Sequence, residues 1–140
     1  IILTRNPKNA IISFSKVIKY PNQDDIGYKL QYESALEFKK IGANFYILNS
    51  DNLLINPKRE LQKICDFSFL DFEENMLNWS KGGIKEDGVW ASYWYKNVHQ
   101  STGFKNSILS SELKIDGSMF PLLKECNYFY KKLINMEVEN

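Results

Sequence analysis

The chain has few cysteines and almost no net charge. Its only cysteines, Cys65 and Cys126, lie far apart, each within an amphipathic run, which predicts buried thiols in a reducing, cytoplasmic compartment, with a disulfide as the alternative. The 18 basic and 17 acidic side chains leave a net charge of +1, so no overall field would hold duplex nucleic acid or an anionic membrane surface. No apolar run approaches the roughly 20 residues of a membrane span. Any anion site must therefore be local.

Histidine is also scarce, and this limits the chemistry that the sequence predicts. The acidic residues form no cluster with cysteine or histidine at metal-ligand spacing, so we expect no metal site. Ser101 and Thr102 lie beside the only histidine, His99. The sequence specifies no adjacent acid to orient this histidine, so we do not predict a catalytic arrangement of hydroxyl, histidine and acid. We expect His99 to fix the loop "NVHQSTGF" through a hydrogen bond, and a catalytic or acceptor-site role is the alternative.

The hydrophobic fraction of 44% is enough for an ordinary core, and residues 1–140 are predicted to be one domain or part of one. The chain begins at Ile1, inside an apolar run. We therefore expect an amino-terminal part to precede it, with further strands and targeting signals of its own.

Strand and helix patterns alternate in the first half of the chain. "IILT" (1–4) is β-branched and apolar, as in a strand buried on both faces of a parallel sheet. The second strand is expected within 44–52 and a loop at 20–27. Helices are expected after Asn6 and Pro7, over 28–41 and over 56–67. The core stripe predicted for the first helix is Ala10, Ile11, Phe14, Val17 and Ile18. This alternation predicts an α/β fold, whose ligands bind beyond the carboxyl ends of the strands.

The second half has a less regular pattern. A short helix is expected at 71–79 and a long one at 119–134. Between them, residues 80–106 combine glycines and tryptophans without clear periodicity. Trp90, Tyr93 and Trp94 are spaced i, i+3, i+4 and are predicted to be core aromatics, with the wall of an acceptor pocket as the alternative.

Arg5 is the main candidate for a local anion site. It follows the first strand and precedes a helix whose amino terminus should offer free N–H groups to an anion. Ser13 lies roughly 10 Å farther along this helix, on its polar face. An arginine fork and a serine hydroxyl can hold two sides of one phosphate. Spacing alone favours the alternative, a solvated face with Arg5 paired to a carboxylate.

Three segments resemble sulfotransferases. In "RNPKNAIISF", Arg5 and Ser13 match the family's Arg-(Asn/Asp)-Pro and the serine eight residues later. "NPKRELQKI" (56–64) is similar to the segment that follows a strand and an acidic loop in cytosolic members. "EDGVWASYWYKNVHQSTGF" (86–104) is similar to the closing region of a bacterial-type branch. Two motifs in the right order are more specific than either alone.

The resemblance implies a parallel sheet with flanking helices, like that of P-loop nucleoside-phosphate kinases. It implies transfer of a sulfuryl group from 3′-phosphoadenosine 5′-phosphosulfate (PAPS) to a small-molecule or conjugate hydroxyl or amine. Arg5 and Ser13 would bind the 3′-phosphate. Trp79 and Ser80 would contact adenine, unless Trp79 packs the end of its helix. Candidates for the family's basic-glycine loop are Lys81, Gly82 and Lys85.

This chain also departs from the family pattern. The family's lysine-bearing phosphosulfate loop and its catalytic base have no match here and would precede Ile1, so this part is the expected carboxyl-terminal portion and would be inactive alone. Ser50 stands where cytosolic members have an aromatic residue before their acidic pair. The alternatives are a noncatalytic nucleotide-binding or interaction module, or a P-loop kinase that uses ATP.

Overall fold

The computed structural model describes residues 1–105 and 114–137. They divide into two compact units, of which the first contains residues 1–51 and the carboxyl-terminal helix, and the second contains residues 52–105. A single sulfotransferase-type domain over 1–140 stays a prediction.

The first unit contains a two-stranded parallel sheet. β1 (Ile2–Thr4) pairs with β2 (Ile47–Asn49), with Thr4 opposite Asn49. Both strands expected from the sequence are confirmed, although β2 is shorter than the apolar run that contains it. Leu3 is 58% exposed, so burial on both faces is wrong for β1. The structure is thus a mixed helix and strand fold with a small parallel sheet.

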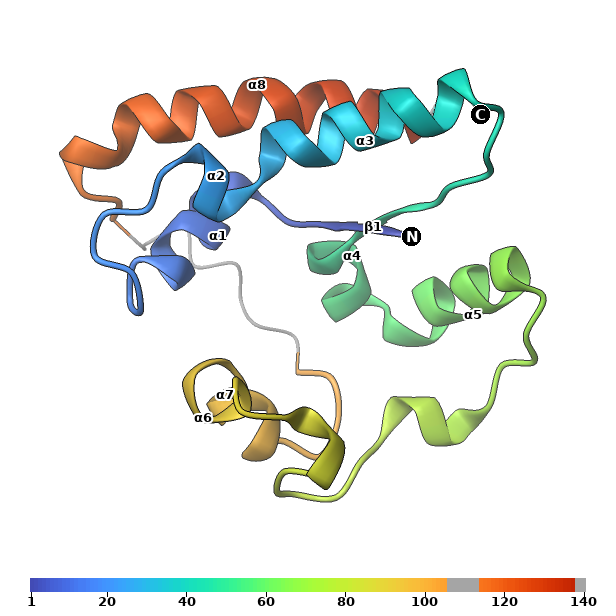
Figure 1. Cartoon of the computed structure of the whole chain (residues 1–140). Helices are drawn as coiled ribbons and strands as arrows, with labels where there is room; N and C mark the ends of the chain where they lie inside the picture. The colour runs from blue at the N-terminus through green and yellow to red at the C-terminus, as the bar shows by residue number, and fades with distance from the viewer. Residues whose placement is uncertain (106–113, 138–140) are drawn as a thin grey trace. The chain divides into compact units, whose positions relative to one another are not determined.

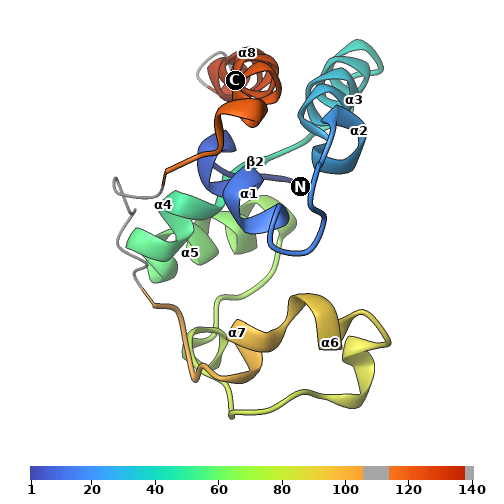
Figure 2. The ribbon, with the colours of Figure 1, turned by 90° about the vertical axis from the view of Figure 1, so that its left-hand side faces the viewer.

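Helices cover one face of this sheet (Figures 1 and 2). α3 (Tyr28–Lys40) and α8 (Phe120–Glu137) lie side by side and contact each other and the strands. Three shorter helices contact α8: α1 (Pro7–Phe14), α2 (Gln23–Ile26) and the 3-10 helix η3 (Gly117–Met119). The two clusters of buried apolar residues are Ile2, Ala35, Ile47, Leu133 and Met136, and Ile11, Tyr28, Met119 and Cys126.

Two local expectations in this unit are wrong. α1 ends at Phe14, so Val17 and Ile18 are exposed and not part of the core. The helix ends there because the Ser15 hydroxyl donates to the Ile12 carbonyl and the next backbone bonds tighten to a three-residue spacing. The expected loop 20–27 contains α2, which forms because Asn22 and Asp25 make a capping box.

The second unit consists of short helices and loops. α4 (Ser50–Ile55) runs into it from the end of β2, and α5 (Pro57–Ser68) confirms the expected helix. The remaining elements are η1 (Glu74–Leu77), η2 (Lys85–Asp87), α6 (Ala91–Trp94) and α7 (Lys96–His99). Trp90 and Tyr93 are each 67% exposed and Trp94 is exposed too, so the prediction that they are core aromatics is wrong. A four-residue helix among glycine loops has too little apolar surface around it to cover three large rings.

Both cysteines are buried, free thiols, as expected. Burial raises the pKa of the Cys126 thiol to about 11. None of the helices in the described part of the chain is long and apolar enough to cross a membrane. Residues 1–105 and 114–137 also contain no group of histidine, cysteine and carboxylate side chains that could hold a metal ion.

Candidate functional site

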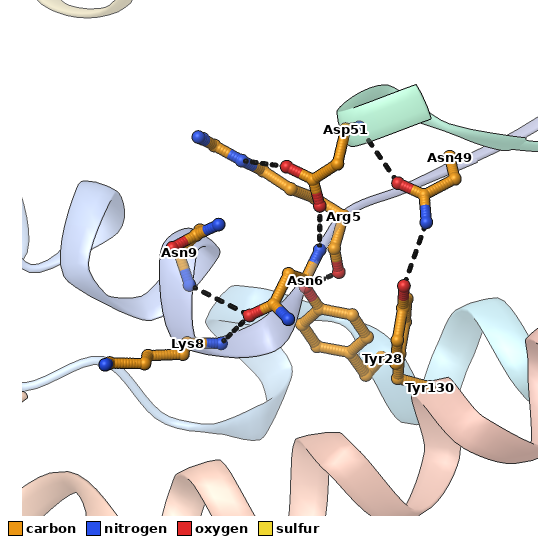
Figure 3. Close-up of polar contacts among 8 residues, drawn as sticks. All are labelled: Arg5, Asn6, Lys8, Asn9, Tyr28, Asn49, Asp51 and Tyr130. Atoms are coloured by element: carbon orange, nitrogen blue, oxygen red, sulfur yellow. Dashed lines mark hydrogen bonds and ion pairs between the residues drawn. The ribbon is translucent and has the colours of Figure 1, made fainter. Parts of the chain in front are cut away.

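The candidate site lies where the two parallel strands end. Arg5 follows β1, and Asp51 follows β2 at the start of α4. The Asp51 carboxylate accepts a hydrogen bond from the Asn6 backbone N–H at 2.7 Å and forms an ion pair with Arg5, at 3.5 Å between Oδ1 and Nε (Figure 3). Asp51 is buried, and one carboxylate therefore joins the two strand ends.

Three further side chains hold the backbone on either side of this pair. The buried Tyr28 hydroxyl donates to the Arg5 carbonyl at 2.8 Å. Asn49 accepts the Asp51 backbone N–H at 2.9 Å and donates to the Tyr130 hydroxyl at 2.9 Å (Figure 3). Burial raises the pKa of Tyr28, so its hydroxyl stays a neutral donor. Side chains from α3 and α8 therefore help to hold the two strand ends in place.

The first turn of α1 does not offer the free N–H groups that we expected. The Asn6 side chain accepts the backbone N–H groups of Lys8 and Asn9, at 3.1 and 3.4 Å (Figure 3). Pro7 has no N–H group, and the Ala10 N–H donates to the Asn6 carbonyl at 3.0 Å. Asn6 is a strong N-cap, so it satisfies donors that would otherwise face an anion. Anion binding here must therefore come from side chains.

The Arg5 side chain keeps part of its donor capacity. It is 36% exposed and contacts Asp51 through Nε. Its two terminal nitrogens have no hydrogen bond or ion pair with residues 1–105 or 114–137. An arginine held in this way can present its terminal fork to a second anion. The spacing favoured an ion pair between Arg5 and a carboxylate, and the resemblance implied that Arg5 binds a phosphate. The two interpretations are compatible, because the ion pair uses Nε and leaves the terminal nitrogens for a second anion.

Ser13 lies in the last turn of α1 and is exposed. No hydrogen bond joins it to Arg5 in the described part of the chain. Arg5 precedes α1 and Ser13 lies near its end. That both residues bind the same phosphate stays a prediction.

The other predicted nucleotide contacts lie in the second unit. Trp79 donates from Nε1 to the Ser101 hydroxyl at 3.1 Å and packs edge-to-face on Phe104, at 5.2 Å between ring centroids. These contacts pack Trp79 against residues 101–104 and favour a structural role for it over adenine stacking. Ser80, Lys81 and Gly82 are exposed, and the Gly82 N–H donates to the His99 carbonyl at 2.8 Å.

His99 forms a pair with an aspartate that sequence reasoning missed. His99 Nε2 lies 2.9 Å from Asp87 Oδ2, and the same oxygen accepts the Ile84 backbone N–H at 2.9 Å. The backbone bond from Ile84 and then the His99 contact lower the pKa of Asp87. Through its side chain and its carbonyl, His99 therefore fixes 82–87 instead of only its own loop. Gly83 makes this possible, because a Cβ there would lie 2.9 Å from His99 Cε1.

Replacing Gly83 by alanine is expected to displace the His99 ring and to raise the pKa of Asp87 toward the ordinary 3.8. The lowered pKa means that the Asp87 contacts stabilise the folded loop above pH 3.8 and are lost as the pH falls through the lower, folded-state pKa. An NMR titration of the Asp87 carboxyl carbon measures this shift. Gly117→Ala is the control, since its Cβ would meet nothing closer than 3.8 Å. An unchanged Asp87 pKa in Gly83→Ala would contradict the expectation.

Comparison with known proteins places the chain in a family. A family model described as "Sulfotransferase domain" matches residues 1–133, and the chain belongs to that family. It is also similar to two proteins of Arabidopsis thaliana. They are branched-chain-amino-acid aminotransferase-like protein 1, 38% identical over 105 residues, and protein 2, 35% identical over 106 residues. Each match covers 75% of this chain and 19% of the relative, so the chain spans about a fifth of their length. No solved structure matches this chain.

The structural signal that sequence reasoning missed is Asp51, which lies just beyond β2 as Arg5 lies just beyond β1. Parallel strands end at the same edge, so an acid just beyond β2 was one possible partner for Arg5, although no local pattern selects Asp51 among the acids of the chain.

Proposed function

We propose that the chain is the donor-binding portion of a PAPS-dependent sulfotransferase with a P-loop-like sheet, and that Arg5 binds the 3′-phosphate. The observation that carries this proposal is the partly exposed Arg5 fork beside the buried Asp51. A permanently charged planar donor suits a dianionic phosphate, and a lysine in its place would lose the bidentate contact.

Ser13 adds a neutral hydroxyl donor to the same phosphate in this proposal. Trp79, Ser80, Lys81 and Gly82 remain candidates for the adenine and phosphate contacts of the second unit. The contacts of Trp79 with Ser101 and Phe104 leave its stacking role the weakest of these assignments.

In the proposed reaction, a bond forms from the acceptor oxygen or nitrogen to sulfur while the bond from sulfur to the phosphate oxygen breaks. Adenosine 3′,5′-bisphosphate leaves, and the acceptor loses a proton. Catalysis of such an in-line transfer rests on positioning and charge stabilisation. The chain has no match to the lysine-bearing phosphosulfate loop, so we assign no catalytic residue to it.

Calorimetry of the full-length protein tests this function. We expect adenosine 3′,5′-bisphosphate to bind more tightly than AMP, and Arg5→Ala to weaken its binding at least about tenfold, because a charge-assisted contact is lost. Arg5→Lys is the matched variant, which keeps the charge that faces Asp51 and should lie between the two. Equal affinity for the bisphosphate and AMP, or unchanged binding in Arg5→Ala, would overturn the proposal. Preferred binding of ATP would instead indicate a kinase.

A further inference from the structure

A cavity of about 230 Å³ opens beside Arg5, at the carboxyl end of β1. Thr4, Arg5, Gln31 and Ser50 contribute polar groups to its wall, and Leu3 and Phe14 are among its apolar residues. Sites for drug-sized molecules measure roughly 300–1,000 Å³, so this cavity has room for about one ring and not for a whole nucleotide. Ser13 does not line it.

Two residues of the cavity wall carry a buried polar atom that has neither a hydrogen bond nor an ion pair in the described part of the chain. Thr4 is only 2% exposed, and its hydroxyl has no hydrogen-bond partner in the described part of the chain. The buried side-chain carbonyl oxygen of Gln31 also has none within residues 1–105 and 114–137. Buried polar groups in folded proteins are almost always hydrogen-bonded, because leaving one unpaired costs stability. Two such residues in the wall of one cavity point to a ligand that brings these atoms partners.

The chemistry of these two groups restricts the ligand. The Gln31 oxygen can only accept a hydrogen bond, whereas the Thr4 hydroxyl can donate or accept. A ligand hydroxyl fits both, since it can donate to Gln31 and accept from Thr4. In a nucleoside 3′-phosphate, the 2′-hydroxyl is on the carbon next to the one that carries the phosphate. A 3′-phosphate on Arg5 would therefore bring a hydroxyl to the mouth of this cavity.

We propose that the cavity receives the ribose of the nucleotide and that Gln31 and Thr4 bind its 2′-hydroxyl, so that the site selects ribonucleotides over 2′-deoxyribonucleotides. This inference rests on the proposed function, because it needs a 3′-phosphate on Arg5. Thr4 reaches the cavity from β1 and Gln31 from α3. Ser50 lies at the end of β2 and lines the same cavity.

Calorimetry of the full-length protein with adenosine 3′,5′-bisphosphate and its 2′-deoxy analogue tests the inference. The wild type should bind the ribonucleotide about tenfold more tightly, as expected for a hydroxyl that pairs two buried groups. Gln31→Leu and Thr4→Val should each reduce this preference and leave the affinity for the deoxy analogue almost unchanged. Gln62→Leu, at an exposed position of α5, is the matched control and should change neither affinity.

A second measurement separates ligand binding from folding. Thr4→Val removes a buried hydroxyl that has no partner, so the ligand-free variant should melt at the same temperature as the wild type or higher. Lower affinity for the ribonucleotide without a lower melting temperature is expected only if Thr4 contacts the ligand.

The outcomes distinguish this inference from the proposed function. Equal affinity of the wild type for the two bisphosphates, with both still weakened by Arg5→Ala, overturns the ribose site and leaves the 3′-phosphate site intact. A preference that survives both Gln31→Leu and Thr4→Val also overturns it. If neither bisphosphate binds more tightly than AMP, the proposed function fails and the ribose site fails with it.

Discussion

Replacement of Asp51 by alanine is expected to lower the free energy of unfolding by about 2–3 kcal/mol. The carboxylate is buried, and its loss leaves the Asn6 N–H without its acceptor and the Arg5 Nε without its ion pair. Hydrogen bonds to charged groups contribute more than neutral ones. Arg5 is 36% exposed, so water offsets part of the loss and the effect stays below that of a fully buried pair. Urea denaturation measures the change.

Asp51→Asn is the matched variant for this prediction. Its amide oxygen can still accept the Asn6 N–H, but the charge that faces Arg5 is gone. We expect it to recover more than half of the stability lost in the alanine variant, because the shorter contact, at 2.7 Å, is the one to Asn6. Equal stability of wild type and Asp51→Ala would show that Asp51 does not hold the strand ends together.

Leu133→Ala should destabilise the first unit by about 2–5 kcal/mol. The Leu133 side chain has no exposed surface and lies in the cluster with Ile2, Ala35 and Ile47, so it joins α8 to β1, α3 and β2. Truncation removes apolar contacts and leaves a cavity that the neighbours on three elements can fill only in part. Thermal and urea denaturation of the full-length protein both report this loss.

Leu30→Ala is the matched control for Leu133, since it removes the same atoms from an exposed position of α3. We expect a change within about 0.5 kcal/mol for this variant. Similar losses at the two positions would mean that α8 is not packed on the sheet as the structure shows.

Much of the order of strands and helices could be predicted from the sequence. The apolar β-branched run 1–4 and the capped helix after Asn56 carry local signals that tertiary contacts did not override. The ends of elements were less predictable. α1 stops at Phe14 because a serine hydroxyl takes a backbone carbonyl, and this competition leaves no trace in hydrophobic periodicity.

The candidate site was predictable in its residue types and not in its pairings. The sequence pattern predicted that Arg5 follows the first strand, and the family resemblance predicted that its guanidinium binds an anion. Its partner Asp51 lies 46 residues away, and no local pattern identifies which acid meets it. The spacing of Trp90 and Tyr93 is typical of a buried helix face, yet burial depends on what surrounds a helix, and α6 is only four residues long.

The hydrogen bond from Tyr28 to the Arg5 carbonyl has a further consequence. It holds the main chain of Arg5 and does not involve its guanidinium. The Cα–Cβ bond at position 5 therefore keeps its place and direction whichever side chain is present. Exchange of the Arg5 side chain would then change the group presented at the end of β1 while the main chain that carries it stays in place, with loss of the ion pair to Asp51 where the new side chain has no charge.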